Sequence, residues 1–276
     1  DVPRPVHLTL ITPQSTAVFD QPGSYSVELT DSETSVIVRE GAATVSAQGK
    51  TVLLDDKERQ RTLVRAGSPP MEALPAERNL IQNGDFDVGL QPGWTTRTQQ
   101  EVPEQPSPVV AVTTAAGQRA VQFSRPGQDL NWAYVGIRQD VNRDVREFSS
   151  LRLHLAVRIE AQDLFNCGAY GTECPVMVRL LYEDKDGAPH EWLKGFHANP
   201  DLSGRTPTFC VTCPPPGAGN HDRLTPGIWR TYDSPNLIQL FGDQQISIAR
   251  VSAIEIYASG HTFVSLISEV ELLAQE

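Results

Sequence analysis

An alternation of apolar and polar residues over positions 151–160, interrupted only by Ala156, restricts the fold of this chain more than any other feature. The sequence there reads Leu-Arg-Leu-His-Leu-Ala-Val-Arg-Ile-Glu, so every second residue from Leu151 is aliphatic. Successive side chains of a strand point to opposite faces, so the pattern predicts an antiparallel strand with one buried and one solvent-facing side. No long stretch has the apolar period of a helix, and 21 Pro and 20 Gly interrupt the chain. The sequence therefore predicts an all-β protein.

The length of 276 residues favours two domains over one. A polar, proline-bearing segment at 67–78 marks the expected boundary. Before it, residues 7–66 form a succession of short β-type runs separated by turns, which predicts a small β sandwich or rolled sheet of about seven strands. We therefore expect a first domain over 1–68, a linker over 69–78 and a larger antiparallel domain over 79–276.

The charge balance excludes several classes of partner. The net charge is −11 at pH 7, and no basic patch is present. Nucleic-acid binding and docking on anionic lipid both need clustered Lys and Arg, so neither is expected. No apolar run approaches the roughly 20 residues that span a bilayer. The first residues, Asp-Val-Pro-Arg-Pro, are typical of a processed or truncated N-terminus, so we expect any signal or membrane anchor to be missing from this sequence.

The two ends of the second domain resemble those of a known fold family. Residues 79–94 read Asn-Leu-Ile-Gln-Asn-Gly-Asp-Phe-Asp-Val-Gly-Leu-Gln-Pro-Gly-Trp, and residues 262–273 contain Ile-Ser-Glu-Val-Glu-Leu. These resemble the opening and closing strands of the galactose-binding-like, carbohydrate-binding-module jelly rolls. The resemblance implies a jelly-roll β-sandwich over 79–276, with its first and last strands meeting near Phe86 and Val270. It also implies binding of a glycan or of a partner protein.

In that family the first and last strands often share a structural calcium. The carboxylates that the resemblance places there are Asp85, Asp87 and Glu269, and Asp87 stands where the family usually has Glu. Calcium prefers six to eight oxygen ligands, which carboxylates and the carbonyls of a glycine turn supply. The alternative is that these are solvated turn carboxylates with no metal.

The first domain resembles the extracytoplasmic domain of FecR-type proteins. The similarity lies in residues 36–54, where a strand, a glycine turn, a Val-x-Ala-x-Gly hairpin and an apolar strand follow one another. The family's closing Gly is replaced by Asp-Asp-Lys-Glu at 55–58. The resemblance implies a relay or scaffold role outside the cytoplasmic membrane, without enzymatic activity.

The four cysteines are spaced as two close pairs, Cys167 with Cys174 and Cys210 with Cys213. They can form two local disulfides outside the reducing cytosol, or hold one structural zinc with four thiolates. Thioredoxin-like exchange by Cys210 and Cys213 would need a βαβ context, which is missing. The extracytoplasmic resemblance favours the disulfides over zinc.

Sugar binding requires an aromatic platform beside hydrogen-bonding side chains. The candidates are Trp132, Trp192, His197 and His154, the last because its strand position faces solvent. The alternative is that the rings belong to the core, as aromatic residues on strands usually do. Trp192 and His197 lie near the start of residues 189–227, which are rich in Pro, Gly, His and Cys and are expected to form a long irregular loop.

No hydrolase motif of the Gly-x-Ser-x-Gly, His-Glu-x-x-His or P-loop type is present. The sequence therefore predicts a non-enzymatic, extracytoplasmic binding or scaffold protein of the cell envelope, whose jelly roll contacts glycan or a partner protein. The alternative is a signalling or structural subunit of an envelope assembly that uses both domains for protein contacts and binds no sugar.

Overall fold

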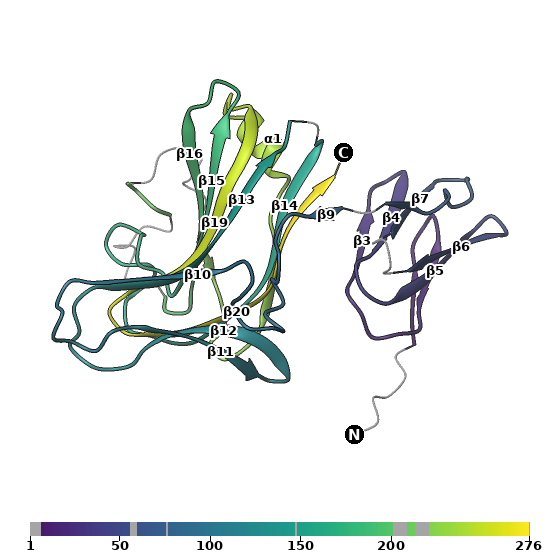
Figure 1. The fold of residues 1–276 in the computed structure, drawn as a ribbon. Helices are drawn as coiled ribbons and strands as arrows, with labels where there is room; N and C mark the ends of the chain where they lie inside the picture. The colour runs from purple at the N-terminus through teal and green to yellow at the C-terminus, as the bar shows by residue number, and fades with distance from the viewer. Residues whose placement is uncertain are drawn as a thin grey trace. The chain divides into compact units, whose positions relative to one another are not determined.

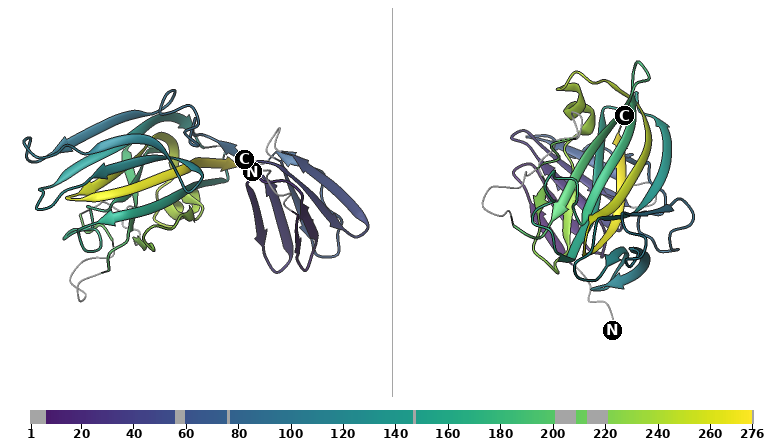
Figure 2. Two further views of the ribbon diagram at one scale, coloured as in Figure 1. Left: turned by 90° about the horizontal axis from the view of Figure 1, so that it is seen from below. Right: turned by 90° about the vertical axis from the view of Figure 1, so that its left-hand side faces the viewer.

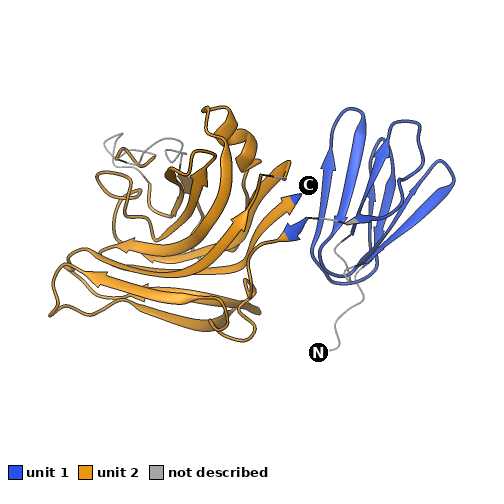
Figure 3. Cartoon of the chain, turned by 45° about the horizontal axis from the view of Figure 1, so that its top comes forward, with its two compact units in different colours: residues 1–78, 275 blue, residues 79–274, 276 orange. Residues whose placement is uncertain are grey.

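The computed structural model describes residues 7–55, 60–75, 77–146, 148–200, 209–212 and 221–275. Within these ranges the chain forms twenty β-strands and one short α-helix, which confirms the all-β prediction. The chain divides into two compact units, residues 1–78 with 275 and residues 79–274 with 276 (Figure 3). No helix in the described part of the chain has the length and apolar character needed to cross a membrane.

The first unit is a small β-sandwich of two four-stranded sheets. One sheet has the order β1 (Leu8–Ile11), β2 (Thr16–Phe19), β5 (Ala42–Ala47), β6 (Lys50–Asp55). The other has the order β3 (Tyr25–Leu29), β4 (Glu33–Val38), β7 (Gln60–Arg65), β8 (Leu74–Pro75). Both sheets contribute to one buried cluster that includes Phe19, Val36, Val45 and Val64.

Residues 69–78 group with this first unit, although their polar, proline-bearing sequence predicts a linker. β8 pairs with β7, and the Thr62 hydroxyl donates a hydrogen bond to the carbonyl of Met71 at 2.6 Å. These contacts hold the segment against the edge of a sheet.

The second unit is a larger β-sandwich, shown from three directions in Figures 1 and 2. Its first sheet has the order β10 (Thr95–Gln100), β13 (Ala133–Asp144), β19 (Ile248–Gly260), β15 (Val176–Asp184), β16 (Pro189–His197), β17 (Asp222–Arg223). Its second sheet has the order β11 (Val109–Ala115), β12 (Gln118–Arg125), β20 (Phe263–Gln275), β14 (Ser150–Gln162), β18 (Arg230–Asp233), with β9 (Arg78–Asn79) added on β20. Helix α1 (Leu237–Gly242) begins after Asn236, whose side chain accepts a hydrogen bond from the Ile238 N–H.

The core of the second unit lies between these two sheets. Alternate residues of the central strands point inward, among them Ile137 of β13, Val178 of β15 and Ile254 and Ile256 of β19. They pack in one buried cluster with the aliphatic residues of β14, including Leu153. The inward half of the alternation at 151–160 is therefore as the sequence predicts.

The two ends of the second unit meet as expected, but a turn takes the place of an opening strand. Residues 80–94 form turns, and Phe86 has a φ of 60°. Phe86 is nevertheless fully buried in the same cluster as Val270. The Val270 N–H donates to the Gly84 carbonyl at 2.9 Å, and a side chain at Gly84 would collide with the Val270 backbone. The close approach of these two backbones thus explains why position 84, in the Asn-Gly sequence, is a glycine.

The prediction of a long irregular loop from residue 189 is wrong for its first nine residues, which form β16. A turn closes behind β15, where the Gly187 N–H donates to the Asp184 carbonyl at 3.0 Å. The chain then returns antiparallel to β15. Trp192 and Phe196 face the core in this return strand, and their burial stabilises it.

Candidate functional site

A network of polar side chains lies on the outer face of the first sheet of the second unit. Two adjoining hollows of about 340 and 540 Å³ open there, and Trp132, Tyr134 and Arg179 line both. We define the outer-face groove as the six residues Arg97, Trp132, Tyr134, Arg179, Glu255 and Tyr257.

Strand register brings these residues together from four strands. Across one rung, Arg97 of β10 is opposite Gly136 of β13, which is opposite Tyr257 of β19. Across another, Glu255 of β19 lies between Arg138 of β13 and Arg179 of β15.

Gly136 leaves room for the two tyrosine rings beside it. A Cβ there would lie 2.6 Å from the Cβ of Tyr257 and 3.0 Å from the hydroxyl of Tyr134. The rings of Tyr134 and Tyr257 are 4.8 Å apart between centroids. The missing side chain therefore lets these rings lie together on the floor of the groove.

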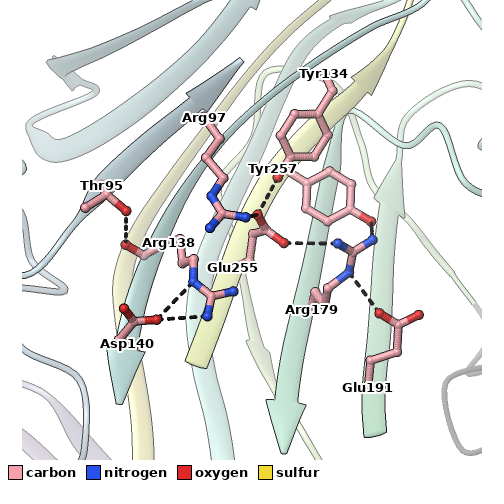
Figure 4. Close-up of polar contacts among 9 residues, drawn as sticks. All are labelled: Thr95, Arg97, Tyr134, Arg138, Asp140, Arg179, Glu191, Glu255 and Tyr257. Carbon is pink, nitrogen blue, oxygen red and sulfur yellow. Dashed lines mark hydrogen bonds and ion pairs between the residues drawn. The ribbon is translucent and has the colours of Figure 1, made fainter. Parts of the chain in front are cut away.

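Glu255 is the electrostatic centre of the groove (Figure 4). Its side chain is only 4% exposed. Oε1 accepts a hydrogen bond from the Tyr134 hydroxyl at 2.7 Å, and Oε2 accepts one from Arg179 Nη1 at 3.1 Å. Arg97 Nη1 lies 3.9 Å from Oε1. A buried carboxylate is stable only when it is paired and hydrogen-bonded, and these three groups supply that compensation.

Arg179 connects Glu255 to its neighbours. Its Nε lies 3.2 Å from Glu191 Oε2 and its Nη2 donates to the Tyr257 hydroxyl at 3.4 Å, as Figure 4 shows. Its Cζ also lies 5.1 Å from the centroid of the Tyr257 ring, within cation–π range. Burial lowers the pKa of Arg179, but Tyr257, Glu191 and Glu255 raise it above its ordinary value. The guanidinium is therefore a permanent cation.

The two tyrosines stay protonated at neutral pH. Burial, followed by the hydrogen bond and the charge of Glu255, raises the pKa of Tyr134 far above its ordinary value. Burial is also the main cause that raises the pKa of Tyr257 to about 12. Both hydroxyls thus remain hydrogen-bonding groups over the whole physiological range.

A disulfide-bridged loop forms one wall of the groove. Cys167 and Cys174 are joined with an S–S distance of 1.96 Å, which confirms that pairing. The bridge packs with Met177, Leu193 and Tyr257 in a small buried cluster on the outer face of the sheet. Thr172, within the bridged loop, lines the groove. The loop is therefore part of the site and not a separate appendage.

The second cysteine pair falls only partly within the described residues. Cys210 is disulfide-bonded. Cys213, its expected partner, lies outside the described residues. A four-thiolate zinc site, the alternative weighed from the sequence, is not formed here because Cys167 and Cys174 are oxidised.

His221 lies beside the Cys167–Cys174 disulfide, with Nδ1 3.7 Å from Cys174 Sγ. Among the described residues, the possible ligand atoms of Cys167, Cys174 and His221 lie within 4.8 Å of one another. Burial, followed by the charges of His197 and Lys194, lowers the pKa of His221 to about 4. The imidazole is therefore neutral at physiological pH.

Trp132 is the sequence-predicted ligand residue that the structure places in the groove. Its ring is half-buried, and Nε1 donates to Ser259 Oγ at 2.9 Å. Its carbonyl accepts from the Glu101 N–H at 3.0 Å. The fully buried guanidinium of Arg125 donates to the carbonyl of Asn131, the preceding residue. These contacts fix the ring, and its remaining surface faces the groove.

Trp192 and His197 are buried, and the expectation of exposed groups at these positions is wrong. Trp192 is 3% exposed and belongs to the core between the sheets. His197 is 5% exposed, and its Nδ1 lies 2.7 Å from the carbonyl of Asn199. Trp192 is on the face of β16 that packs on the core, whereas His197 follows Phe196 and is buried on the opposite face.

His154 lies on β14 in the second sheet, away from the groove. The prediction that it faces solvent is wrong, since it is buried beside β18. It sits opposite Asp233 in that pairing, and its Nδ1 lies 2.7 Å from Asp233 Oδ1. The strand beside it is β18, a short strand at the edge of the sheet. The sequence does not show that β18 pairs with β14.

The residues proposed for calcium make separate local contacts. Asp85 Oδ1 accepts from the Asp87 N–H at 3.3 Å, as in an Asx turn. Glu269 Oε1 accepts from the Gln118 side chain at 2.9 Å. Among the described residues, the possible metal ligands that lie close together are Cys167, Cys174 and His221, and not these carboxylates. Calcium binding at these three carboxylates stays a prediction.

Sequence reasoning missed Arg97, Arg179, Glu255 and Tyr257. A usable signal was present for two of them. Arg179 and Glu255 are single charged residues between apolar neighbours, as in Ile254-Glu-Ile256. An isolated charge at that spacing marks a side chain on the outer face of an otherwise buried strand. Which outer-face residues meet across the sheet depends on strand order, which no local pattern specifies.

Comparisons with known proteins bear on the fold alone. No family model matches the chain, and no curated protein matches it. The FecR resemblance of the first unit therefore gains no support from them. The second unit, by its own geometry, belongs to the class of antiparallel β-sandwiches.

Among solved structures, the chain is similar to the family 11 carbohydrate-binding module of Clostridium thermocellum in complex with a β-1,3-1,4-mixed-linked tetrasaccharide, with a TM-score of 0.37 and 10% identity over 72% of this chain and 96% of that one. It is also similar to the xyloglucanase domain of a type three effector from Sinorhizobium fredii, with a TM-score of 0.40 and 11% identity over 67% and 94%.

A further match is the enzymatically active domain of a bacteriophage tailspike protein, with a TM-score of 0.40 and 9% identity. It involves 71% of this chain but only 21% of the tailspike chain. At such identities and scores these likenesses carry no functional argument, so the proposals below rest on the chain's own geometry.

Proposed function

We propose that the second unit binds carbohydrate in the outer-face groove, without catalysing a reaction on it. The observation that carries this proposal is that Trp132 and Tyr134 line a hollow together with Arg97, Arg179 and Glu255. A sugar ring has an apolar face that packs on an aromatic ring and a rim of hydroxyls that need donors and acceptors.

The groove offers both kinds of surface in one place. The half-buried indole of Trp132 is held by Ser259, and the residue lines the hollow. Polar residues of the same lining are Arg97, Thr98, Gln99, Tyr134, Arg179 and Glu255. Because the floor residues are already fixed by one another, little side-chain entropy is lost when a ligand binds.

The state of Glu255 supports binding without catalysis. Glycoside hydrolysis uses a pair of carboxyl groups, one as general acid and the other as base or nucleophile. Each oxygen of Glu255 is already occupied, one by Tyr134 and the other by Arg179. A carboxylate so engaged serves to orient its neighbours.

The Cys167–Cys174 disulfide supports a location outside the reducing cytosol, since such bridges persist mainly in oxidising compartments. An extracytoplasmic glycan-binding or scaffold protein of the cell envelope remains the most specific function we propose.

The test is a binding titration with a panel of soluble polysaccharides. Replacing Trp132 by Ala should weaken binding at least about tenfold, because loss of a central aromatic contact typically costs about 2 kcal/mol. The matched control is Trp229→Ala, which removes another half-buried tryptophan whose Nε1 donates to the Ala115 carbonyl outside the groove. Equal affinity of W132A and wild type, or a wild type that binds no glycan but a specific protein, would contradict the proposal.

A further inference from the structure

We infer that the groove selects a glycan carrying an acidic sugar residue, and that Arg97 binds the carboxylate of that residue. This inference rests on the proposed function and specifies the class of ligand. It follows from the charged side chains in and beside the groove.

Figure 4 draws three cations and three anions of the outer face: Arg97, Arg138, Arg179, Asp140, Glu191 and Glu255. Arg138 is paired with Asp140, with Nη2 2.8 Å from Oδ1. Arg179 is paired on two sides, with Glu191 at 3.2 Å and Glu255 at 3.1 Å. Of these three arginines, Arg97 is the one with no nitrogen within 3.2 Å of a carboxylate oxygen of this set.

Arg97 approaches Glu255 only to 3.9 Å, and that carboxylate already accepts hydrogen bonds from Tyr134 and Arg179. The Arg97 side chain is 58% exposed and lines the larger hollow. A guanidinium has five donors in a planar fork, which matches a carboxylate in a bidentate pair. The donors of Arg97 that Glu255 does not engage are therefore available to a ligand carboxylate.

The position of Arg97 fits a sugar already seated on the aromatic rings. It comes from β10, the edge strand of the sheet, and shares the hollow with Trp132 and Tyr134. A sugar packed on Trp132 would thus have a cation within the same hollow.

The charge of the whole chain limits how acidic the ligand can be. The net charge is −11, so a uniformly acidic polysaccharide is repelled at long range. A single short-range ion pair with Arg97 instead favours a mainly neutral polysaccharide that carries isolated acidic sugar units. A uronic acid unit on a neutral backbone has this chemistry.

The test compares two probes that differ in one feature, a linear xylan and a glucuronic-acid-substituted xylan of similar length, titrated against the full chain. Wild type should bind the substituted probe about tenfold more tightly, and the preference should shrink when NaCl is raised from roughly 0.05 to 0.5 M. Arg97→Gln should remove the preference and Arg97→Lys should keep part of it, whereas the matched control Arg138→Gln should keep all of it.

The outcomes separate this inference from the proposed function. Equal binding of both probes by wild type, or an unchanged preference in R97Q, overturns the inference. If Trp132→Ala still weakens binding in that case, the proposed function stands. If wild type binds neither these probes nor any other polysaccharide of the panel, both are overturned. Thermal melts of each variant establish that it is folded, and Arg97 is exposed enough for its replacement to be tolerated.

Discussion

Glu255 is an almost fully buried carboxylate on the outer face of the first sheet. Its neighbours in sequence, Ile254 and Ile256, are fully buried between the sheets, while its own side chain turns to the outer face and is 4% exposed there. Two arginines and a tyrosine hydroxyl offset the cost of burying this charge. The same contacts fix the direction of the Tyr134 and Arg179 side chains. The buried carboxylate of Glu255 therefore also orders the groove.

His221 is a second buried group whose charge state is set by its surroundings, and it leads to a pH prediction. Its pKa is lowered to about 4 in the folded chain, mainly by burial, against about 6.5 when unfolded. Between these values the unfolded state binds more protons, so the free energy of unfolding falls as the pH drops from about 6.5 to about 4. The loss attributable to His221 should be about 3 kcal/mol.

Urea unfolding of wild type and His221→Gln at a series of pH values measures this contribution. The variant should lose less stability than wild type over that pH interval, even if it is less stable at pH 7. Parallel pH curves for the two proteins would show that His221 does not titrate in this way.

Part of the strand content was predictable from the sequence, but the arrangement of the strands was not. Alternation marked residues 151–160, and the turn at Asp184 marked the start of a return strand. The turn implies β16, yet the Pro, Gly and His residues that follow obscured it. The burial of His154 and Trp192 was missed because one cannot tell from a single strand which other elements cover it. Tyr134 and Glu255 are 121 positions apart and meet only through the order β13-β19.

The bridged loop at 167–174 is the element that connects stability with the site. It packs on Met177, Leu193 and Tyr257 and closes one side of the groove. Replacing both Cys167 and Cys174 by Ser should lower the free energy of unfolding by about 2 kcal/mol, the chain-entropy value for so short a ring. It should also weaken glycan binding, because the wall that contains Thr172 loses its anchor.

Unfolding curves and titrations of the double variant should be compared with those of Trp229→Ala, which leaves the bridge intact. A variant that is less stable but binds glycan as well as wild type would show that the loop is not part of the binding surface.

At the scale of the whole molecule, each unit has a core of its own, and the groove is built from the second unit alone. The first unit is a small sandwich for which the FecR resemblance remains a prediction about family. The long-range charge of the chain and the local charge of the groove have opposite consequences for an acidic ligand. Binding should therefore depend on contacts within the groove and not on attraction from a distance.

The most direct measurement is a crystal structure of the full chain with a bound oligosaccharide from the titrated panel. We predict that a sugar ring packs on Trp132 and Tyr134 over β13 and β19, with its polar groups at Arg97 and Arg179. A sugar bound instead beside His154 on the second sheet, or on the first unit, would contradict the account.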